Sequence, residues 1–355
     1  MTGSASSAAE KTPDPMAAFA ERIVARHIRS VSRAITLIEN GDPRIRVVLD
    51  ALVSVPGRAK IIGVTGVPGA GKSTLVPALA KAFSAGEQPV AVLAVDPSSP
   101  LSGGAILGDR IRDTTGGNAS IFYRSIASRG SLGGLSRTLD DVVTLLEAAG
   151  FSTVLIETVG TGQSEVAVTR LAHTTLMLTA PGLGDEVQAM KAGILEVADF
   201  IIVNKADSDP RGAEMAALTL RQAISETQRA HGLSEGSNNA EDPERAAWLA
   251  PVRTISAARG QGVDELGALI LDHRRFLEAS HTLAKWREQR LLERFMDGLR
   301  NALLEEMLSS HRARFEAISR EVAEGGISPL RAAAQLAEMA VGRTPGWQTQ
   351  GGKDE

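Results

Sequence analysis

The chain has 355 residues, no cysteine and a formal net charge of −4. This length fits one large domain with additions, and the missing cysteines exclude disulfides, zinc–thiolate sites and iron–sulfur clusters. The charge offers no basic field for nucleic acid or an acidic membrane surface, and no apolar run reaches the about 18 residues of a membrane span. We therefore expect a cytoplasmic protein that binds neither nucleic acid nor membrane.

The N-terminal part of the chain predicts helices. Residues 1–15 are rich in Ala, Ser, Thr and Pro and contain no Arg, which predicts a disordered tail rather than a secretory or mitochondrial leader. Apolar residues then recur at three- and four-residue spacing from Met16 to about Asn40, and a second helical pattern runs from Pro43 to Val55. Because both patterns precede the first expected strand, we assign residues 16–58 to an N-terminal helical extension.

Residues 59–279 alternate short apolar, β-branched runs with helical patterns. Runs such as Ile201-Ile202-Val203 are apolar throughout, as strands buried on both faces of a parallel sheet require. The alternation predicts an α/β fold, a doubly wound and mainly parallel sheet. The expected strands are 61–64, 90–95, 120–123, 153–156, 175–178, 200–203 and 252–255, and the expected helices include 136–149, 186–196 and 212–229.

A glycine-rich segment follows the first expected strand and reads Gly66-Val67-Pro68-Gly69-Ala70-Gly71-Lys72-Ser73, with Thr74 next. Its glycines let backbone N–H groups turn toward phosphates, and the N-terminus of the following helix adds partial positive charge. We expect Lys72 to reach the β- and γ-phosphates and the Ser73 hydroxyl to ligate Mg²⁺. The sequence thus predicts a P-loop.

Two more acidic residues could approach the metal. Asp96 closes the strand 90–95, and ligands bind at that edge of a doubly wound sheet, so it can approach the metal or an attacking water. Asp109 lies in a glycine-rich stretch that we interpret as a loop over the nucleotide. Helix-cap and turn roles are the alternative for both residues.

Glu157-Thr158-Val159-Gly160 follows the strand 153–156 and resembles the Asp-x-x-Gly switch element, with Glu in the Asp position. We expect Glu157 to hold Mg²⁺ through water and the Gly160 N–H to bond the γ-phosphate, so that hydrolysis frees the segment 161–165. Gln163 and Glu165 are candidates for orienting the attacking water, with a solvated loop role as the alternative.

A further motif predicts which nucleotide base is bound. Asn204-Lys205-Ala206-Asp207 ends the strand 200–203, and the Asp carboxylate can accept hydrogen bonds from N1–H and the 2-amino group of guanine, which adenine lacks. The Lys205 stem covers the ring, Asn204 braces the loops, and Ser256-Ala257 offers a backbone N–H to the guanine oxygen. These motifs together favour GTP over ATP.

The chain closes with a loop-like segment and further helices. Residues 232–244 are rich in Gly, Ser, Asn, Asp and Glu and predict a surface loop. Helical patterns then cover 283–308, continue to about Glu324 and return over 328–340. They cannot bury themselves against a sheet that is already covered on both faces, so we expect them to dock on the domain or on a second subunit.

Several segments resemble the MeaB/ArgK GTPases, the methylmalonyl-CoA mutase-associated group in the signal-recognition/MinD class of P-loop proteins. The resemblance covers about residues 60–277 and extends more loosely into both helical ends. The Glu in place of the switch Asp belongs to this group's pattern. The segments that carry the resemblance are 63–74, 94–108, 129–134, 157–165 and 181–196.

The resemblance implies a GTP-hydrolysing chaperone that gates adenosylcobalamin loading and protects or reactivates a cobalamin-dependent acyl-CoA mutase, such as methylmalonyl-CoA mutase. It also implies a homodimer joined through C-terminal helices, which assigns 280–342 to dimerisation and leaves 343–355 as a disordered tail. Asp185 and Lys191 lie in a segment that resembles a mobile element sensing nucleotide and partner. Because an Asp-x-His-x-x-Gly motif is absent, any cobalamin would be held by the partner.

Two rival functions remain to be weighed. A nickel-type metal-delivery GTPase would need clustered Cys or His, which this chain does not offer. A transport-associated ATPase or kinase conflicts with Asn204 and Asp207. Among the arginines, Arg110, Arg112, Arg124 and Arg129 are candidates for a side chain directed at the phosphates.

Overall fold

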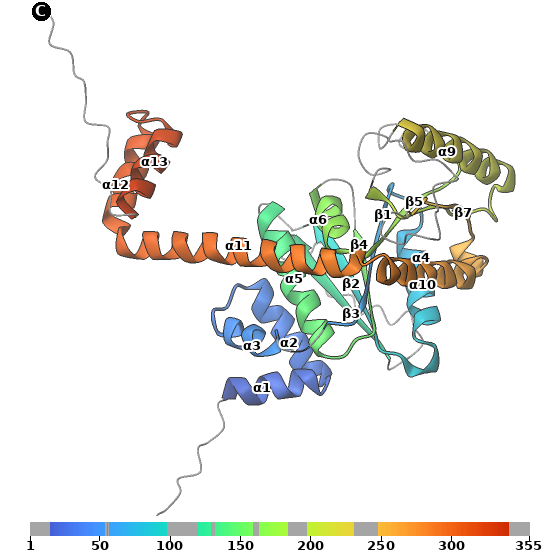
Figure 1. Ribbon diagram of the computed structural model, residues 1–355, viewed down its shortest axis with the longest axis horizontal. Coiled ribbons are helices and arrows are strands. Elements are labelled where there is room, and N and C mark those ends of the chain that lie inside the picture. Colours follow the sequence, from blue (N-terminus) through green and yellow to red (C-terminus); the bar gives the residue numbers. More distant parts are fainter. Residues whose placement is uncertain are drawn as a thin grey trace, which may run out of the picture. The chain divides into compact units, whose positions relative to one another are not determined.

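The computed structural model describes residues 15–53, 55, 57–97, 120–128, 132–158, 163–183, 197–230 and 248–340. The chain divides into two compact units, Met1–Leu283 and Ala284–Glu355. In the described part of the first unit, seven parallel strands form one sheet in the order β3-β2-β4-β1-β5-β6-β7 (Figure 1). This confirms the predicted α/β doubly wound fold. The strands are β1 (Lys60–Gly66), β2 (Val90–Pro97), β3 (Ile121–Ser128), β4 (Thr153–Thr158), β5 (Thr174–Thr179), β6 (Phe200–Val203) and β7 (Val252–Thr254).

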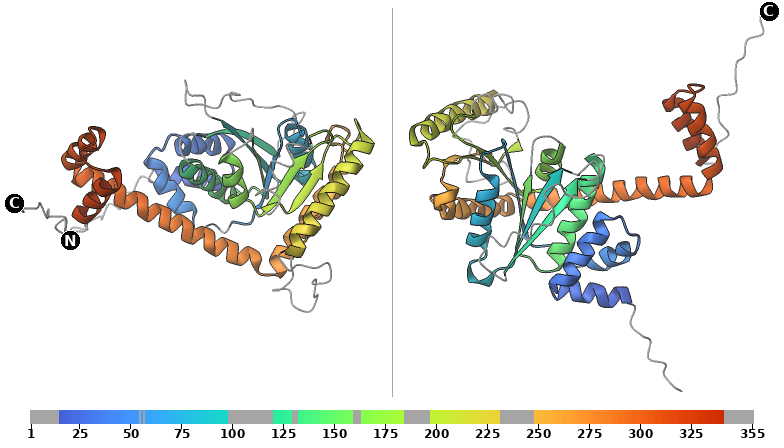
Figure 2. Two further views of the ribbon diagram at one scale, coloured as in Figure 1. Left: turned by 90° about the horizontal axis from the view of Figure 1, so that it is seen from above. Right: turned by 180° about the vertical axis from the view of Figure 1, so that it is seen from behind.

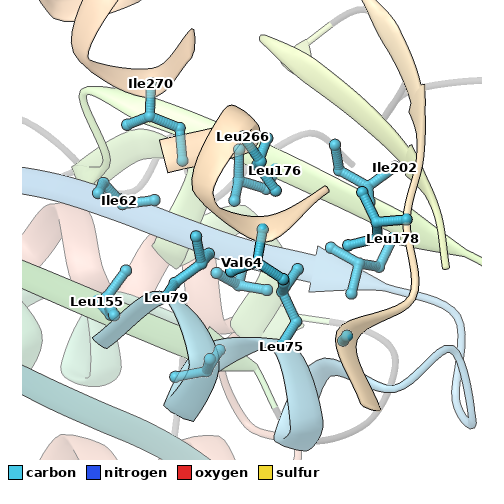
Figure 3. Packing of buried hydrophobic residues seen from close by; sticks show 14 of the residues in the cluster. Ile62, Val64, Leu75, Leu79, Leu155, Leu176, Leu178, Ile202, Leu266 and Ile270 are labelled. Carbon is cyan, nitrogen blue, oxygen red and sulfur yellow. The ribbon is translucent and has the colours of Figure 1, made fainter. Parts of the chain in front are cut away.

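Helices cover both faces of the sheet because alternate strand residues point to opposite sides. On one face, Leu75 and Leu79 of α4 and Leu266 and Ile270 of α10 meet strand residues such as Leu176 in one continuous core (Figure 3). The other face is covered by α5, α6 and α9. These helices are α4 (Lys72–Phe83), α5 (Leu132–Ala148), α6 (Gln163–Leu171), α9 (Pro210–Ala230) and α10 (Val263–Ala279).

The side-chain alternation is clear in β5 and β6. Leu176 and Ile202 belong to the core under α4 and α10. Met177 and Ile201 instead pack with Ala213 and other residues of α9. Every residue of β4 and β5 is buried, which explains why apolar residues stand next to one another in the middle of both strands instead of alternating with polar ones.

The N-terminal helices belong to the first unit. They are α1 (Pro15–Val24), α2 (Ile28–Glu39) and α3 (Arg44–Leu52), and they contact one another and α5 (Figures 1 and 2). The expectation of one helical pattern from Met16 to Asn40 is wrong in one respect. The chain turns between α1 and α2, where Arg26 adopts the left-handed φ of 53°, because Ile23 and Val31 can then both face the core.

The second unit is helical in its described part. It contains most of α11 (Thr282–Ser310), followed by α12 (Arg312–Ala323) and α13 (Pro329–Ala340). Ile318, Ala332 and Leu336 form a small core between α12 and α13. No helix among the described residues is both long and apolar enough to cross a membrane.

Candidate nucleotide site

The predicted motifs meet at one edge of the sheet. The P-loop follows β1, Asp96 ends β2, Glu157 lies at the end of β4 and Asn204 follows β6. All these strands are parallel, so their carboxyl ends share that edge, where doubly wound sheets bind ligands.

Two P-loop glycines are required by their surroundings. Gly66 has φ of 134°, and a Cβ there would collide with the backbone of Leu178 on β5. Gly71 has φ of 95°, and a Cβ there would collide with the side-chain amide of Asn204. A residue with a side chain would be strained at either position, so these two glycines let the loop pass close to β5 and to the base-binding loop.

Lys72 begins α4 directly after Gly71 and is buried. Its Nζ donates to the carbonyl oxygens of Gly66 at 2.5 Å and Val67 at 3.2 Å. Burial lowers the pKa of Lys72, while the nearby carboxylates of Glu165 and Glu157 act in the opposite direction. The ammonium group therefore lies inside the P-loop, with two carboxylates close enough to favour its charged form.

Glu157, the carboxylate of the predicted switch element, lies close to the end of its strand. Glu157 is buried at the end of β4. Beside it, the hydroxyl of Thr158 donates to Thr65 on β1 at 3.4 Å, which links the two strands below the P-loop. Glu165 is buried within α6, so its reading as a solvated loop residue is wrong.

Several residues of the predicted site lie partly or wholly outside what the structure describes. The backbone of Asp96 ends β2, opposite Ala127 of β3, and the backbone of Gln163 begins α6, but both side chains lie outside the description. Asp109, Gly160, Asp185 and Lys191, together with the expected helix 186–196 and the expected loop 232–244, lie outside the described residues.

Asn204 joins the predicted phosphate-binding segment to the predicted base-binding segment. Its Nδ2 donates to the carbonyl of Ala70 in the P-loop at 2.8 Å, and its Oδ1 accepts the N–H of Ala257 at 2.9 Å. The side chain is 2% exposed. Both of its polar ends are thus satisfied inside the protein, and three segments of the site are held together through one amide.

Asp207 is held on both carboxylate oxygens. The Ser256 hydroxyl donates to Oδ1 at 2.6 Å, and Nε of Arg259 lies 3.2 Å from Oδ2. The pKa of Asp207 is held below its usual range. The main cause is the hydrogen bond from Ser256, and Arg259 adds a smaller effect. An ionised carboxylate, which can only accept hydrogen bonds, is therefore presented at the base end.

Two arginines differ from what the sequence predicts. The only signal for Arg259 is its place in the short turn Ala257–Arg259, where Ser256 caps the N-terminus and accepts the N–H of Arg259. Arg124 was a candidate for the phosphates, but its guanidinium donates to Glu39 and Thr36 of α2 at 2.8 and 3.1 Å. Its charge is thus committed to the N-terminal helices.

Within the described part of the chain, no group of three or more His, Asp or Glu side chains could hold a metal ion. A stored or delivered metal thus has no cluster to bind in that part of the structure.

Comparison with known proteins gives consistent matches. The sequence profile of the family described as methylmalonyl-CoA mutase-associated GTPase MeaB matches residues 31–312. A Pyrococcus horikoshii protein is 38% identical over 330 residues, 93% of this chain and 99% of that protein. The mouse mitochondrial methylmalonic aciduria type A homolog is 31% identical over 327 residues, 85% of this chain and 74% of that protein. A solved structure titled LAO/AO transport system kinase superposes with a TM-score of 0.63 at 28% identity, covering 93% of this chain and 99% of that one.

Proposed function

The chain belongs to the MeaB family of methylmalonyl-CoA mutase-associated GTPases, and from this premise we propose that it is the GTP-hydrolysing chaperone of a cobalamin-dependent acyl-CoA mutase. In this role it gates adenosylcobalamin loading and protects or reactivates the mutase. The observation that carries the nucleotide-switch part of the proposal is a pair of hydrogen bonds: the Asn204 side chain bonds both the P-loop and the loop that would bind the base. The mutase part is supported by the family match and by the mouse relative.

The P-loop residues form the proposed phosphate site. Backbone N–H groups of residues 66–74 would surround the phosphates at the N-terminus of α4. Lys72 now bonds two carbonyls of its own loop, and a triphosphate would offer it oxygens with a full negative charge instead. Exchange of neutral carbonyl acceptors for anionic phosphate oxygens strengthens the hydrogen bonds of the ammonium group and favours the bound state.

Magnesium fits the residues at this edge. Mg²⁺ prefers oxygen ligands and keeps several waters, and the site offers the Ser73 hydroxyl and the buried carboxylate of Glu157. We assign the metal to Ser73 and Glu157, with Asp96 and Asp109 as further ligands. When bound, the metal would neutralise charge that develops on the phosphate oxygens during transfer.

The base-binding residues would select guanine. The ionised Asp207 carboxylate has lone pairs left beside Ser256 and Arg259, and N1–H and the 2-amino group of guanine can fill them. Lys205 adopts a left-handed φ of 61°, and we assign its stem to the face of the ring. The Ala257 N–H is bonded to Asn204, so it would serve the guanine oxygen only by sharing its proton between two acceptors.

Hydrolysis and signalling would occur between these two ends. We assign the Gly160 N–H to the γ-phosphate and Gln163 to the attacking water, with the buried Glu165 beside Lys72 as a second candidate. Loss of the γ-phosphate would release the segment after β4. Asp185 and Lys191 would report the nucleotide state to the mutase, which itself holds the cobalamin.

A homodimer is part of the proposal because α11 carries an unpartnered apolar stripe. Leu292, Met296, Leu299 and Leu303 follow one another at spacings of four, three and four residues, which places them on one helix face. They are 58%, 45%, 41% and 62% exposed. Such a continuous exposed stripe indicates an interaction surface, and a second copy of α11 would cover it.

A pull-down tests the partner. The tagged protein, loaded with GDP or with a non-hydrolysable GTP analogue, is mixed with purified cobalamin-dependent acyl-CoA mutases of the same organism. Recovery of one mutase, with different yields in the two nucleotide states, would support the proposal. If the protein binds the GTP analogue but recovers no such mutase in either state, the chaperone function is wrong while the GTP site stands.

A competition titration tests the base choice separately. The solved structure with a kinase title makes ATP the alternative ligand to exclude. GTP should displace a fluorescent guanine nucleotide at far lower concentration than ATP. Tighter binding of ATP would contradict the assignment of Asp207.

A further inference from the structure

Glu39 is a carboxylate in a position that local helix chemistry disfavours. It is the last residue of α2, where the helix dipole repels negative charge. Its side chain is only 9% exposed. A buried anion at a helix C-terminus is destabilising unless other groups compensate it, so the compensating partners indicate what the residue does.

These partners come from the edge strand of the sheet. Nη2 of Arg124 on β3 lies 2.8 Å from Oε2 of Glu39, and the N–H of Ala127 donates to Oε1 at 3.3 Å. Arg124 also donates to Thr36, one turn earlier on α2. One carboxylate therefore binds both a side chain and a backbone N–H of the same strand.

Ala127 lies next to the nucleotide edge. β3 is the outermost strand of the described sheet, so its outward N–H groups have no neighbouring strand to bond. Glu39 supplies the missing acceptor near the carboxyl end of β3. In the β2–β3 register, Ala127 pairs directly with Asp96, and Ser128 pairs with Pro97.

We propose that Glu39 is a positioning residue for the magnesium side of the nucleotide site. It fixes the carboxyl end of β3 from outside, and through the Ala127–Asp96 pairing it fixes the backbone of Asp96 on β2. The N-terminal helices would thereby be part of the GTPase machinery rather than a passive cover. This inference rests on the proposed function of Asp96 at the metal.

The test compares Glu39→Ala and Glu39→Gln with the parent protein. Two quantities are measured: the Mg²⁺ concentration for half-maximal GTP hydrolysis, and the affinity for GDP without Mg²⁺. Groups that bond a metal ligand directly typically change metal affinity about 10–100-fold when they are mutated, and Glu39 acts on Asp96 only through Ala127, so we expect the lower end of this range. Glu39→Ala should therefore raise the Mg²⁺ requirement about tenfold while GDP affinity without Mg²⁺ stays constant, because P-loop and base contacts are untouched.

Glu39→Gln gives a graded result. Its amide oxygen can still accept the Ala127 N–H, but the side chain carries no charge to pair with Arg124. The Mg²⁺ requirement should rise less than in Glu39→Ala. Asp42→Asn is the matched control, because Asp42 also pairs with an arginine of the N-terminal helices, Arg44 at 2.6 Å, but at the surface. It should leave both quantities unchanged.

A double-mutant comparison separates the positioning role of Glu39 from the metal-binding role proposed for Asp96. Asp96→Asn should itself raise the Mg²⁺ requirement, and if it does not, the proposed role of Asp96 fails whatever Glu39 does. If it does, Glu39→Ala should add little in the Asp96→Asn background, because residues that act through one another are not additive. An unchanged Mg²⁺ requirement in Glu39→Ala, or full additivity, would overturn the inference even if the melting temperature falls. Should Glu39→Ala not fold, Glu39→Gln is judged by the same two criteria.

Discussion

At the scale of single residues, the most demanding position is Asn204. Its buried amide satisfies the Ala70 carbonyl and the Ala257 N–H together, so its loss leaves two polar groups without partners. Each such group costs about 1–3 kcal/mol. The Asn204 side chain therefore stabilises the folded protein even before any nucleotide binds.

Asn204→Ala should lower the free energy of unfolding of the nucleotide-free protein by about 2–6 kcal/mol. Urea denaturation measures it. Thr219→Ala serves as a control, because this exposed hydroxyl bonds the Met215 carbonyl of its own helix, and its effect should stay within about 0.5 kcal/mol. Equal effects of the two substitutions would show that the Asn204 bonds do not brace the site.

Asp207→Asn should weaken GTP binding by about two orders of magnitude or more, because an amide presents a donor where guanine also presents donors. Binding of xanthosine triphosphate should improve, since its base offers an acceptor at the 2-position. Isothermal titration calorimetry with each nucleotide measures the two affinities. Asp209→Asn is the neighbouring control, because Asp209 bonds the Gly212 N–H and not the Ser256 group. A GTP affinity that Asp207→Asn leaves intact would contradict the base assignment.

Some of these residues could be predicted from the sequence and others could not. The P-loop and Asn204–Asp207 are contiguous, and each follows a strand, so their chemistry is local. Glu39 and Arg124 are 85 positions apart, and neither belongs to a motif. Arg259 has a signal only once the turn after Ser256 is known. Pairings that depend on tertiary packing leave no periodic trace in one sequence.

At the scale of elements, β5, β6 and α10 meet at a polar contact on the edge opposite the nucleotide. Nε2 of His273 lies 3.4 Å from Oδ1 of Asp199, and the Thr175 N–H donates to Asp199 Oδ2 at 2.8 Å. Burial raises the pKa of Asp199 to about 7 and lowers the pKa of His273 to about 4. Both side chains are therefore neutral in the folded protein between about pH 4 and 6.5.

The two titrations have opposite effects on stability in this window. Folded Asp199 keeps a proton that the unfolded chain has lost, so its contribution to stability falls as pH rises. Folded His273 lacks a proton that the unfolded chain holds, so its contribution rises with pH. The sum is nearly flat across the window.

Asp199→Asn should reveal the contribution of His273 to the pH dependence of stability, because the opposing contribution of Asp199 is removed. Between pH 4 and 6.5, the variant's free energy of unfolding should rise relative to the parent's, by less than about 1.4 kcal/mol per pH unit, because the Asp199 side chain retains 30% exposure. Urea denaturation at several pH values measures this difference. Asp272→Asn, at an exposed pair with Arg275 on the same helix, should give a curve parallel to the parent's. A parallel curve for Asp199→Asn would contradict the raised pKa.

Some element boundaries follow from the local sequence, and others depend on packing. β6 begins and ends as predicted because it is short, apolar and followed by a motif. The turn at Arg26 was missed because the apolar spacing continues across it, and only packing of α1 and α2 requires the break. β3 proved longer than expected because Arg124 and Ser125 interrupt its apolar pattern, while Glu39 satisfies its outer edge.

At the scale of the whole molecule, the apolar stripe of α11 predicts the oligomeric state. Leu299→Glu places a charge in its middle, and burying an unpaired carboxylate is too costly for the interface to persist. The parent should have the mass of a dimer by light scattering, and the variant that of a monomer. Met215→Glu, on α9 and 63% exposed, should remain dimeric. A monomeric parent, or an unaffected variant, would contradict the assignment of this surface.

The central claim is that the nucleotide state and the mutase are coupled through this molecule. Thermodynamic linkage requires that, if the GTP-bound form binds the mutase more tightly than the GDP-bound form by some factor, the mutase shifts the relative affinity for GTP over GDP by the same factor. The most direct measurement is the affinity of the purified mutase for the protein loaded with GDP and with a non-hydrolysable GTP analogue, alongside the two nucleotide affinities with and without mutase. We predict two different mutase affinities and equal factors in both directions. Identical mutase affinities in the two nucleotide states would contradict it.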